Sequence, residues 1–320
     1  MSIALKACRF ALLLAAAACL AVPAQASAPQ QKTQAPGYYR MMLGDFEITA
    51  LSDGFFAMDV GQIFTHVTPQ QLASDLKRAF LASPVDTSVN GFLVNTGQKL
   101  VLIDTGSGVL FGPTVGKLRA NLAAAGYQVE QVDEIYITHM HGDHIGGLVI
   151  DGKRAFPNAV VRAAKQDADT WLSKERMDAA PKEAKDSFRA AMNSLNPYVA
   201  AGKFKPFDGA TELVPGVRAQ PAPGHTPGHT VYVIESKGRK LLLWGDLMHV
   251  AAVQFPDPAA AIHFDTDSNE AAASRKQIFA DAAAKGYLIG GAHLSFPGMG
   301  HLRAAGTGYT YLPINYDAIH

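Results

Sequence analysis

The chain has 320 residues, and its 28 lysines and arginines balance its 28 aspartates and glutamates to a formal net charge of +0. Because no basic stripe accompanies this balance, we exclude nucleic acid as the partner. The only cysteines are Cys8 and Cys19, so a metal site elsewhere in the chain must use nitrogen and oxygen ligands.

The N-terminus is typical of a secretory signal peptide over residues 1–26. Lys6 and Arg9 form a positive region, residues 10–22 are apolar, and an Ala-Gln-Ala cleavage site ends at Ala26. The apolar run is shorter than the roughly 20 residues that span a bilayer. We therefore expect cleavage after Ala26, export to the periplasm or beyond, and no stable membrane insertion.

The mature chain is predicted to form one domain. Residues 27–37, rich in alanine, glutamine and proline, are expected to be a disordered leader, and residues 38–320 a single domain with its own hydrophobic core. A lipid anchor at Cys19 is an alternative to simple secretion that the sequence leaves open.

Strands and helices are predicted to alternate through the first half of this domain. Thr68 before Pro69, with Gln71 three residues on, is a typical helix start. In chain order we expect a strand over 46–51 ending at the turn Asp53-Gly54, a helix from Pro69, strands over 88–95 and 100–103, a helix over 113–125 and a strand over 135–138.

The second half follows the same pattern. We expect one helical segment over 165–192, strands over 231–234 and 240–244, a helix over 269–285 and a strand over 287–289. This interleaving predicts a layered α/β protein, and several polar residues follow the strands directly, where loop-borne sites usually lie.

The run His-Met-His-Gly-Asp-His is the strongest functional signal. An apolar strand leads into it, so His139 and His141 begin on one face, and the turn that follows returns Asp143 and His144 toward them. Three imidazoles and a carboxylate within six positions suit zinc or another borderline divalent cation.

Three later segments each present a polar residue among glycines beside an apolar strand. They are Gly-His-Thr-Pro-Gly-His beginning with His225, Gly-Asp ending at Asp246, and Gly-Ala-His ending at His293. Each is weak alone, since a single histidine is more often structural. Together with the first motif, and in this order, they indicate one metal cluster.

The ordered set H-x-H-x-D-H, GHTPGH, GD and a late histidine resembles the metallo-β-lactamase superfamily over nearly the whole mature chain. The resemblance implies an αββα sandwich with two divalent cations between its sheets, zinc first, with manganese, cobalt or iron as alternatives. It assigns one metal to His139, His141 and His225, the other to Asp143, His144 and His293, and makes Asp246 the bridge.

The resemblance also implies supporting residues. Asp104, in Asp-Thr-Gly, is expected to orient a ligand imidazole by accepting its other N–H, although a simple turn aspartate is an alternative. His229 is expected to support a ligand residue or to be structural, and not to bind a metal, because the superfamily's ligand is the first histidine of its motif, here His225.

The implied reaction is hydrolysis by a metal-bound hydroxide. Asp143 and Asp246 are the expected catalytic carboxylates, Asp246 by bridging the metals and Asp143 by relaying a proton to the leaving group. A cysteine nucleophile is excluded, because both cysteines lie in the predicted signal peptide.

A finer resemblance concerns the substrate. The C-terminal run over 292–303, with Pro-Ile-Asn-Tyr ending at Tyr316, looks like methyl parathion hydrolase and its secreted lactonase relatives, which implies a homodimer. By this resemblance an apolar pocket is walled by Phe111, Trp171 and Phe188 and flanked by His249, Ile262 and Phe264. The three wall residues are as readily ordinary core aromatics.

An imidazole at position 249, where we associate leucine with dedicated organophosphate enzymes, and a bulky Phe264 favour a lactonase or arylesterase. Aryl lactones are the expected substrates, with weak phosphotriesterase activity. Acyl-homoserine lactones and phosphotriesters are the alternative substrates. A non-catalytic metal-binding protein is disfavoured by the complete ligand set.

Overall fold

The structure is a computed structural model that describes residues 28–316. The chain divides into two compact units, 1–35 and 36–320, and every described helix and strand lies in the second. The predicted signal peptide, with Cys19, lies outside the described residues. Within the described part, no helix has both the length and the apolar character needed to cross a membrane.

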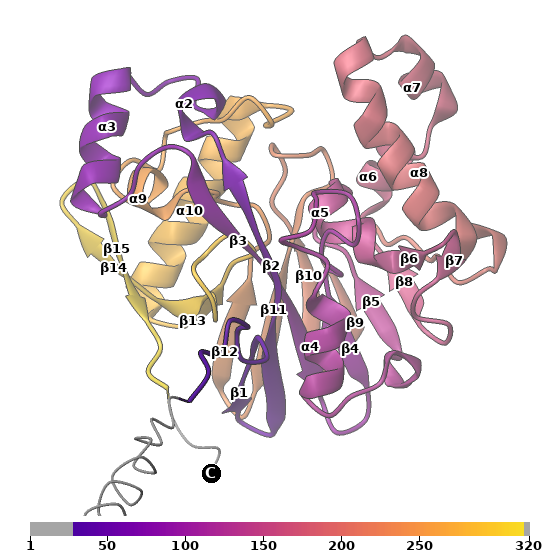
Figure 1. Cartoon of the computed structure of the whole chain (residues 1–320). Helices are drawn as coiled ribbons and strands as arrows, with labels where there is room; N and C mark the ends of the chain where they lie inside the picture. Colours follow the sequence, from indigo (N-terminus) through magenta and orange to yellow (C-terminus); the bar gives the residue numbers. More distant parts are fainter. Residues whose placement is uncertain (1–27, 317–320) are drawn as a thin grey trace, which may run out of the picture. The chain divides into compact units, whose positions relative to one another are not determined.

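Two β-sheets form the centre of the second unit (Figure 1). The first has the order β1-β2-β3-β4-β5-β8, with β1 Tyr38–Leu43, β2 Phe46–Met58, β3 Val85–Asn95, β4 Leu100–Ile103, β5 Glu134–Tyr136 and β8 Val160–Arg162. The second has the order β15-β14-β13-β12-β11-β10-β9, with β9 Thr211–Val214, β10 Val217–Pro221, β11 Thr230–Ser236, β12 Arg239–Leu243, β13 Leu288–Gly290, β14 Met299–Ala305 and β15 Gly308–Pro313. A small hairpin joins β6 Val149–Ile150 to β7 Lys153–Arg154.

Alternation along the strands makes the layers. In β3, Phe92 and Val94 point into a core shared with residues of the second sheet such as Tyr232 and Leu243. Leu93, between them, points to the opposite face and joins a separate cluster. Because successive side chains of a strand point to opposite faces, the first sheet buries both of its faces.

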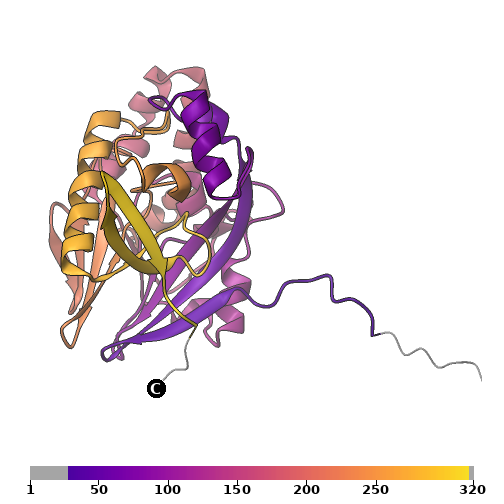
Figure 2. The same cartoon turned by 90° about the vertical axis from the view of Figure 1, so that its left-hand side faces the viewer.

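Helices cover the two outer faces (Figures 1 and 2). The first sheet packs on residues of α4 Leu118–Ala124 and α8 Lys185–Ala200. The second packs on Ile278 and Phe279 of α10 Ser268–Lys285. The remaining helices are α2 Val60–Ile63, α3 Pro69–Arg78, α5 Gly142–Ile145, α6 Lys165–Trp171, α7 Lys174–Ala179 and α9 Ala251–Gln254, with 3-10 turns η2 Val129–Gln131, η3 Gly146–Leu148 and η4 Lys182–Ala184. The predicted α/β αββα sandwich is therefore confirmed.

The directions of the strands place the loops that carry the predicted metal ligands, here called the functional loops, at one edge of the two sheets. β4 runs parallel to β5, and β12 runs parallel to β13, so the loops after these strands leave at a common end of each sheet. β11 is antiparallel to β12 and starts at the same end. The two ends meet where Thr230 N donates to Thr138 O at 2.9 Å.

Three local expectations need correction. β2 does not end at Asp53-Gly54 but continues to Met58 through a bulge, where Gly54 has a φ of 122°. The helix expected over 113–125 begins only at Leu118, because the buried Asp53 carboxylate binds the backbone N–H groups of Gly116 and Leu118 at 3.0 Å each and holds the preceding residues in a turn.

The third correction concerns the segment 165–192, which is not one helix. It is divided into α6, α7 and α8, of which α8 continues to Ala200. Ser173 caps α7 by accepting from Arg176 N, and Pro181 follows the end of that helix. Pro181 lacks the N–H donor that a helix running on from α7 would need at this position. By contrast, the predicted cap at Thr68 is confirmed, with Gln71 N donating to its hydroxyl.

Candidate metal centre

Seven side chains converge at the edge where the functional loops meet. They come from the loop after β5, from α5, from the loop between β10 and β11, and from the loops after β12 and β13. In chain order they are His139, His141, Asp143, His144, His225, Asp246 and His293, all predicted from the sequence.

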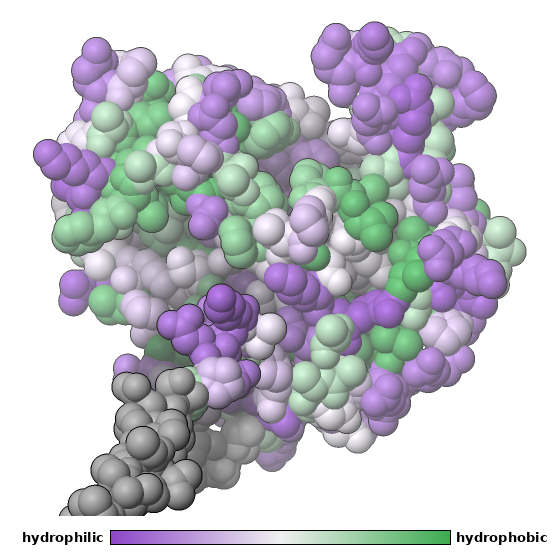
Figure 3. All heavy atoms as spheres, in the orientation of Figure 1, coloured by the Kyte–Doolittle hydropathy of each residue, from purple (hydrophilic) through white to green (hydrophobic). Residues whose placement is uncertain are grey.

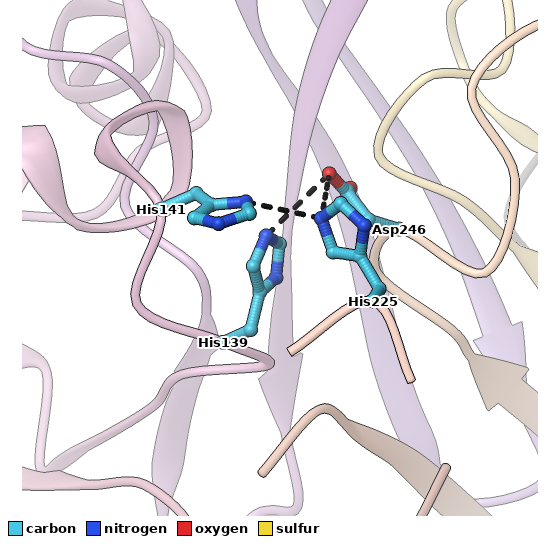
Figure 4. A group of neighbouring side chains, drawn as sticks. All are labelled: His139, His141, His225 and Asp246. Carbon is cyan, nitrogen blue, oxygen red and sulfur yellow. Dashed lines mark hydrogen bonds and ion pairs between the residues drawn. The ribbon is translucent and has the colours of Figure 1, made fainter. Parts of the chain in front are cut away.

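These side chains form two groups that share Asp246. In the three-histidine group, His139, His141, His225 and Asp246 have ligand atoms within 4.8 Å of one another (Figure 4). The Asp143 group, made of Asp143, His144, His293 and Asp246, meets the same limit.

The two oxygens of Asp246 together reach histidines of both groups. Oδ2 lies 3.5 Å from Nε2 of His139 and 3.5 Å from Nε2 of His225. Oδ1 lies 3.1 Å from Nε2 of His144 and 3.2 Å from Nε2 of His293, which also lies 3.3 Å from Oδ2. A carboxylate that contacts both groups in this way is suited to bridging two cations.

The donor set fits two divalent cations. His139 Nε2, His144 Nε2 and Asp246 Oδ1 are buried and have no hydrogen-bond partner. Buried polar atoms without partners are rare in proteins, and here they point into nitrogen–oxygen groups of the kind that bind zinc and similar ions. The chain therefore carries a site suited to two metals, while the identity of the metal stays a prediction.

Burial and neighbouring charges shift the pKa values of the clustered side chains. Burial opposes charge on Asp246, but His144 and His293 outweigh it and hold the Asp246 pKa well below its ordinary value. Burial likewise opposes charge on His293, yet Asp246 and Asp143 raise its pKa to about 10. Burial lowers the pKa of His141 to about 3, which keeps its ring neutral and able to ligate.

Asp104 takes the position expected of a supporting carboxylate. Its Oδ2 lies 2.8 Å from Nδ1 of His144, so that ring's Nε2 is directed at Asp246. Thr138 donates to it from both N and Oγ1 at 2.8 Å each. Asp104 has a φ of 59°, an uncommon conformation for a residue other than glycine that these contacts hold in place.

His225 has a corresponding support that the sequence reasoning missed. Its Nδ1 lies 2.9 Å from Asp265 Oδ1, which directs Nε2 toward the three-histidine group. The buried Arg275 lies 4.0 Å from Asp265 and donates to the carbonyls of Leu247 and Ala260. No sequence signal marked Asp265, because it follows no motif and approaches His225 only through the fold.

His229 stays outside both groups, as the sequence reasoning expected. Its Nδ1 lies 3.0 Å from the carbonyl of Ala222, and its Nε2 accepts a hydrogen bond from Asp246 N at 3.1 Å. The ring therefore holds the backbone of the shared aspartate and has no nitrogen left for a metal.

The aromatic residues predicted to wall a pocket stand around the cluster. Trp171 packs edge-on to His141, with ring centroids 5.4 Å apart, and Phe188 packs on Trp171 at 4.9 Å. Phe111 is 44% exposed and stacks on Phe56, a residue that the sequence reasoning missed. Phe56 in turn lies 6.0 Å from His293.

The other predicted pocket residues have different surroundings. His249 Nε2 lies 3.0 Å from Asp246 Oδ2, and its ring stacks on His293 at 5.1 Å. Ile262 has no exposed surface and packs in a hydrophobic cluster with Val250 and Val253. Phe264 is 43% exposed, so of these three it alone offers substantial surface to solvent. Figure 3 shows a hollow between the hydrophilic tip that carries α7 and the lobe that carries α3.

Comparisons with known proteins agree with this site. A family model described as the metallo-beta-lactamase superfamily matches residues 84–293. A crystal structure of AbOPH, a hydrolase in the beta lactamase superfamily, is 38% identical with a TM-score of 0.85, covering 89% of this chain and all of that one. AidC, a dizinc quorum-quenching lactonase in complex with its product, is 31% identical with a TM-score of 0.82, covering 88% of this chain and 99% of that one.

Curated relatives found by sequence align over shorter stretches. An N-acyl homoserine lactonase of Bacillus cereus is 27% identical over 148 residues, which are 46% of this chain and 50% of the lactonase. An atrochrysone carboxyl ACP thioesterase of Aspergillus novofumigatus is 29% identical over 148 residues, and the chain spans only 35% of its length.

Proposed function

The chain belongs to the metallo-beta-lactamase superfamily and is a metal-dependent hydrolase, and from this premise we propose that it is a lactonase and arylesterase whose preferred substrates are aryl lactones. Weak phosphotriesterase activity is part of the proposal. So is a closer kinship to methyl parathion hydrolase and its lactonase relatives, which rests on the C-terminal sequence.

One observation carries the proposal: Asp246 belongs to two histidine groups at once, beside an aromatic wall. The shared carboxylate supports a centre with two cations. The wall formed by Trp171 and Phe188 supports an apolar substrate next to it.

Two bound cations would polarise a carbonyl oxygen and lower the pKa of a water toward neutrality. The chain's residues hold and orient this chemistry. Asp143 Oδ2 lies 3.4 Å from His293 Nε2 and 3.5 Å from His144 Nε2. Burial opposes charge on Asp143, but His144 and His293 outweigh it and lower the Asp143 pKa. Asp143 is thus an ionised carboxylate beside the reacting position, where it could accept a proton from the attacking water and pass it to the leaving alkoxide.

Polar groups at the wall are suited to an ester. The indole Nε1 of Trp171 is buried and has no hydrogen-bond partner. Burial lowers the pKa of His249 to about 4, which makes its ring neutral at pH 7 and a hydrogen-bonding group beside Asp246. A site whose polar groups hydrogen-bond a planar ester disfavours other substrates, because those substrates leave the polar groups of the site unpaired.

Acyl-homoserine lactones are the second candidate substrates. The observation that favours them is the 31% identity to AidC over nearly all of both chains. An acyl chain and an aryl ring are both apolar, so the aromatic wall accommodates either class.

A side-by-side assay tests the proposal. Zinc-loaded protein of residues 27–320 is expected to turn over dihydrocoumarin faster than an acyl-homoserine lactone or paraoxon. Higher kcat/KM on paraoxon than on either lactone would make the protein a phosphotriesterase. Higher kcat/KM on the acyl-homoserine lactone would favour the second candidate.

Replacing His249 with leucine is expected to shift the substrate ratio. The change removes an imidazole that contacts Asp246 Oδ2 and leaves an apolar side chain of similar bulk. We expect kcat/KM for dihydrocoumarin to fall about tenfold, the worth of one good hydrogen bond, while that for paraoxon stays equal or rises. Parallel changes for both substrates would show that His249 does not distinguish them, and Phe264→Leu provides a comparison that alters bulk alone.

Export and assembly also belong to the proposal. The N-terminal sequence supports a periplasmic or secreted protein, and the finer resemblance supports a homodimer. Cell fractionation with N-terminal sequencing, and light scattering on the purified chain, would test these two points.

A further inference from the structure

A buried carboxylate outside both metal groups joins two of the functional loops. Asp167 lies on α6 and has no exposed surface. Its Oδ2 accepts hydrogen bonds from Met140 N and Thr226 Oγ1, each at 3.0 Å. Its Oδ1 accepts from Gly228 N at 2.6 Å. One side chain thus binds the loop after β5 and the loop before β11 at once.

Those two loops supply every histidine of the three-histidine group. Met140 lies between His139 and His141, and Thr226 directly follows His225. A shift of either partner away from Asp167 would therefore move a ligand imidazole with it. The loop before β11 also packs closely on α6, since a Cβ at Gly228 would lie 2.5 Å from the backbone nitrogen of Asp167.

The burial of the Asp167 carboxylate opposes folding. Among the described residues, no lysine or arginine forms an ion pair with it. Burial raises its pKa to about 6 in spite of the three hydrogen bonds. Buried carboxylates generally need pairing or several donors, and here all of the donors belong to ligand-bearing loops.

The Asp143 group has separate supports. Asp104 holds His144, and Nδ1 of His293 lies 2.8 Å from the carbonyl of Ser88. None of these contacts involves Asp167. Asp104 also reaches the three-histidine group through Thr138, whose Oγ1 lies 3.1 Å from Nδ1 of His139, whereas the hydrogen bonds of Asp167 go only to the loops that carry the three histidines.

We propose that Asp167 is a positioning residue that preorganises the three-histidine group, so that His139, His141 and His225 are aimed at one cation before it binds. The inference rests on the two-metal centre of the proposed function and adds a residue outside the ligand set that controls one half of it. Without the carboxylate, the two loops must be ordered by the metal itself, and the cost of ordering them reduces its affinity.

Zinc affinity of the two groups, measured separately, tests this role. His293→Ala leaves the three-histidine group complete, and His141→Ala leaves the Asp143 group complete. Adding Asp167→Asn to the first background is expected to weaken zinc binding about 10- to 100-fold, as loss of a supporting carboxylate does. Adding it to the second is expected to change affinity less than about threefold, because no hydrogen bond of Asp167 reaches a member of the Asp143 group. Competition with a chromophoric chelator gives these values without any activity assay.

Asp53→Asn is the matched control. Asp53 is equally buried and accepts from three backbone N–H groups, those of Ser107, Gly116 and Leu118, but it binds neither histidine loop. Its effect on the affinity of the three-histidine group is expected to stay below about threefold. If Asp53→Asn and Asp167→Asn weaken that group equally, the effect is general destabilisation and the positioning role is wrong.

A milder variant covers the case in which Asp167→Asn does not fold. Thr226→Val keeps the shape of the side chain and removes only its hydrogen bond to Asp167, so the same affinity should fall by about 3- to 10-fold. An unchanged affinity would overturn the inference, as would equal losses in both backgrounds. Wild-type protein that binds two zinc ions but cleaves no lactone would refute the proposed function and leave this inference intact.

Discussion

Asp246→Asn is expected to retain one metal per chain and to lose at least about a thousandfold in kcat/KM. The substitution preserves shape, but one carboxylate oxygen becomes an NH2 group that donates and cannot ligate. Because Oδ2 is the oxygen near His139 and Oδ1 the oxygen near His144, a single remaining oxygen serves one group better than the other. Loss of one of two cooperating cations removes several kcal/mol of transition-state stabilisation, and each 1.36 kcal/mol is about tenfold in rate.

Metal analysis and steady-state kinetics on dihydrocoumarin would check this result. Asp265→Asn is the graded control, because Asp265 touches the metal groups only through His225, and it should cost about 10- to 100-fold in metal affinity. If Asp246→Asn kept two metals and wild-type turnover, Asp246 would not be a shared ligand. The two-metal proposal would then fail.

Removal of metal is expected to abolish hydrolysis and lower the melting temperature. The ligands come from both sheets, so a bound cation connects loops that the metal-free fold holds only through hydrogen bonds and ion pairs. At a thousand times its Kd, one ligand stabilises the folded state by about 4 kcal/mol. For a chain of this size that is about 7 °C in melting temperature.

The size of this effect should depend on pH. The pKa of His293 is raised to about 10, so its pairing with Asp246 and Asp143 stabilises the metal-free fold fully below its ordinary value of 6.5 and is lost as the pH rises toward 10. A metal needs the deprotonated ring, so zinc affinity should increase over the same range. Metal-stripped protein with and without added zinc should therefore differ less in melting temperature at pH 6 than at pH 8.

Calorimetry in buffers of different ionisation enthalpy would count the protons that zinc releases. A His293→Ala variant should release fewer of them. Equal stabilisation by zinc at pH 6 and pH 8 would contradict the assigned charge state of the cluster. Turnover that persists in protein shown to be free of metal would contradict a metal-dependent reaction altogether.

The candidate ligands could be predicted from sequence because their residue types and spacing are recognisable within short segments. His139, His141, Asp143 and His144 are crowded after an apolar strand, and residues such as Asp246 follow strands among glycines. Metal chemistry restricts the donor atoms to a few residue types, so spacing and order are informative. The second histidine of its motif, His229, lies outside both groups and contacts the backbone of Ala222 and Asp246.

Element boundaries were predictable where the signals are local and failed where they are not. The cap at Thr68 depends on a hydroxyl and an N–H three residues apart, and the structure has it. The late start of α4 depends on Asp53, which lies more than sixty residues earlier and captures the N–H groups that a helix would use. No pattern within 113–125 could show that.

By itself, the sequence determined the superfamily, the αββα layers and the residues that gather in the candidate metal centre. Strand alternation and ligand chemistry both depend on residues that are close together in the sequence. Only the tertiary structure decided how those residues are held. Asp104 reaches His144 across 40 positions, Asp265 reaches His225 across 40, and Asp167 joins loops on both sides of it. An aspartate that accepts such bonds looks like any other in the sequence, since its partners are backbone groups and rings that only the folded chain brings within reach.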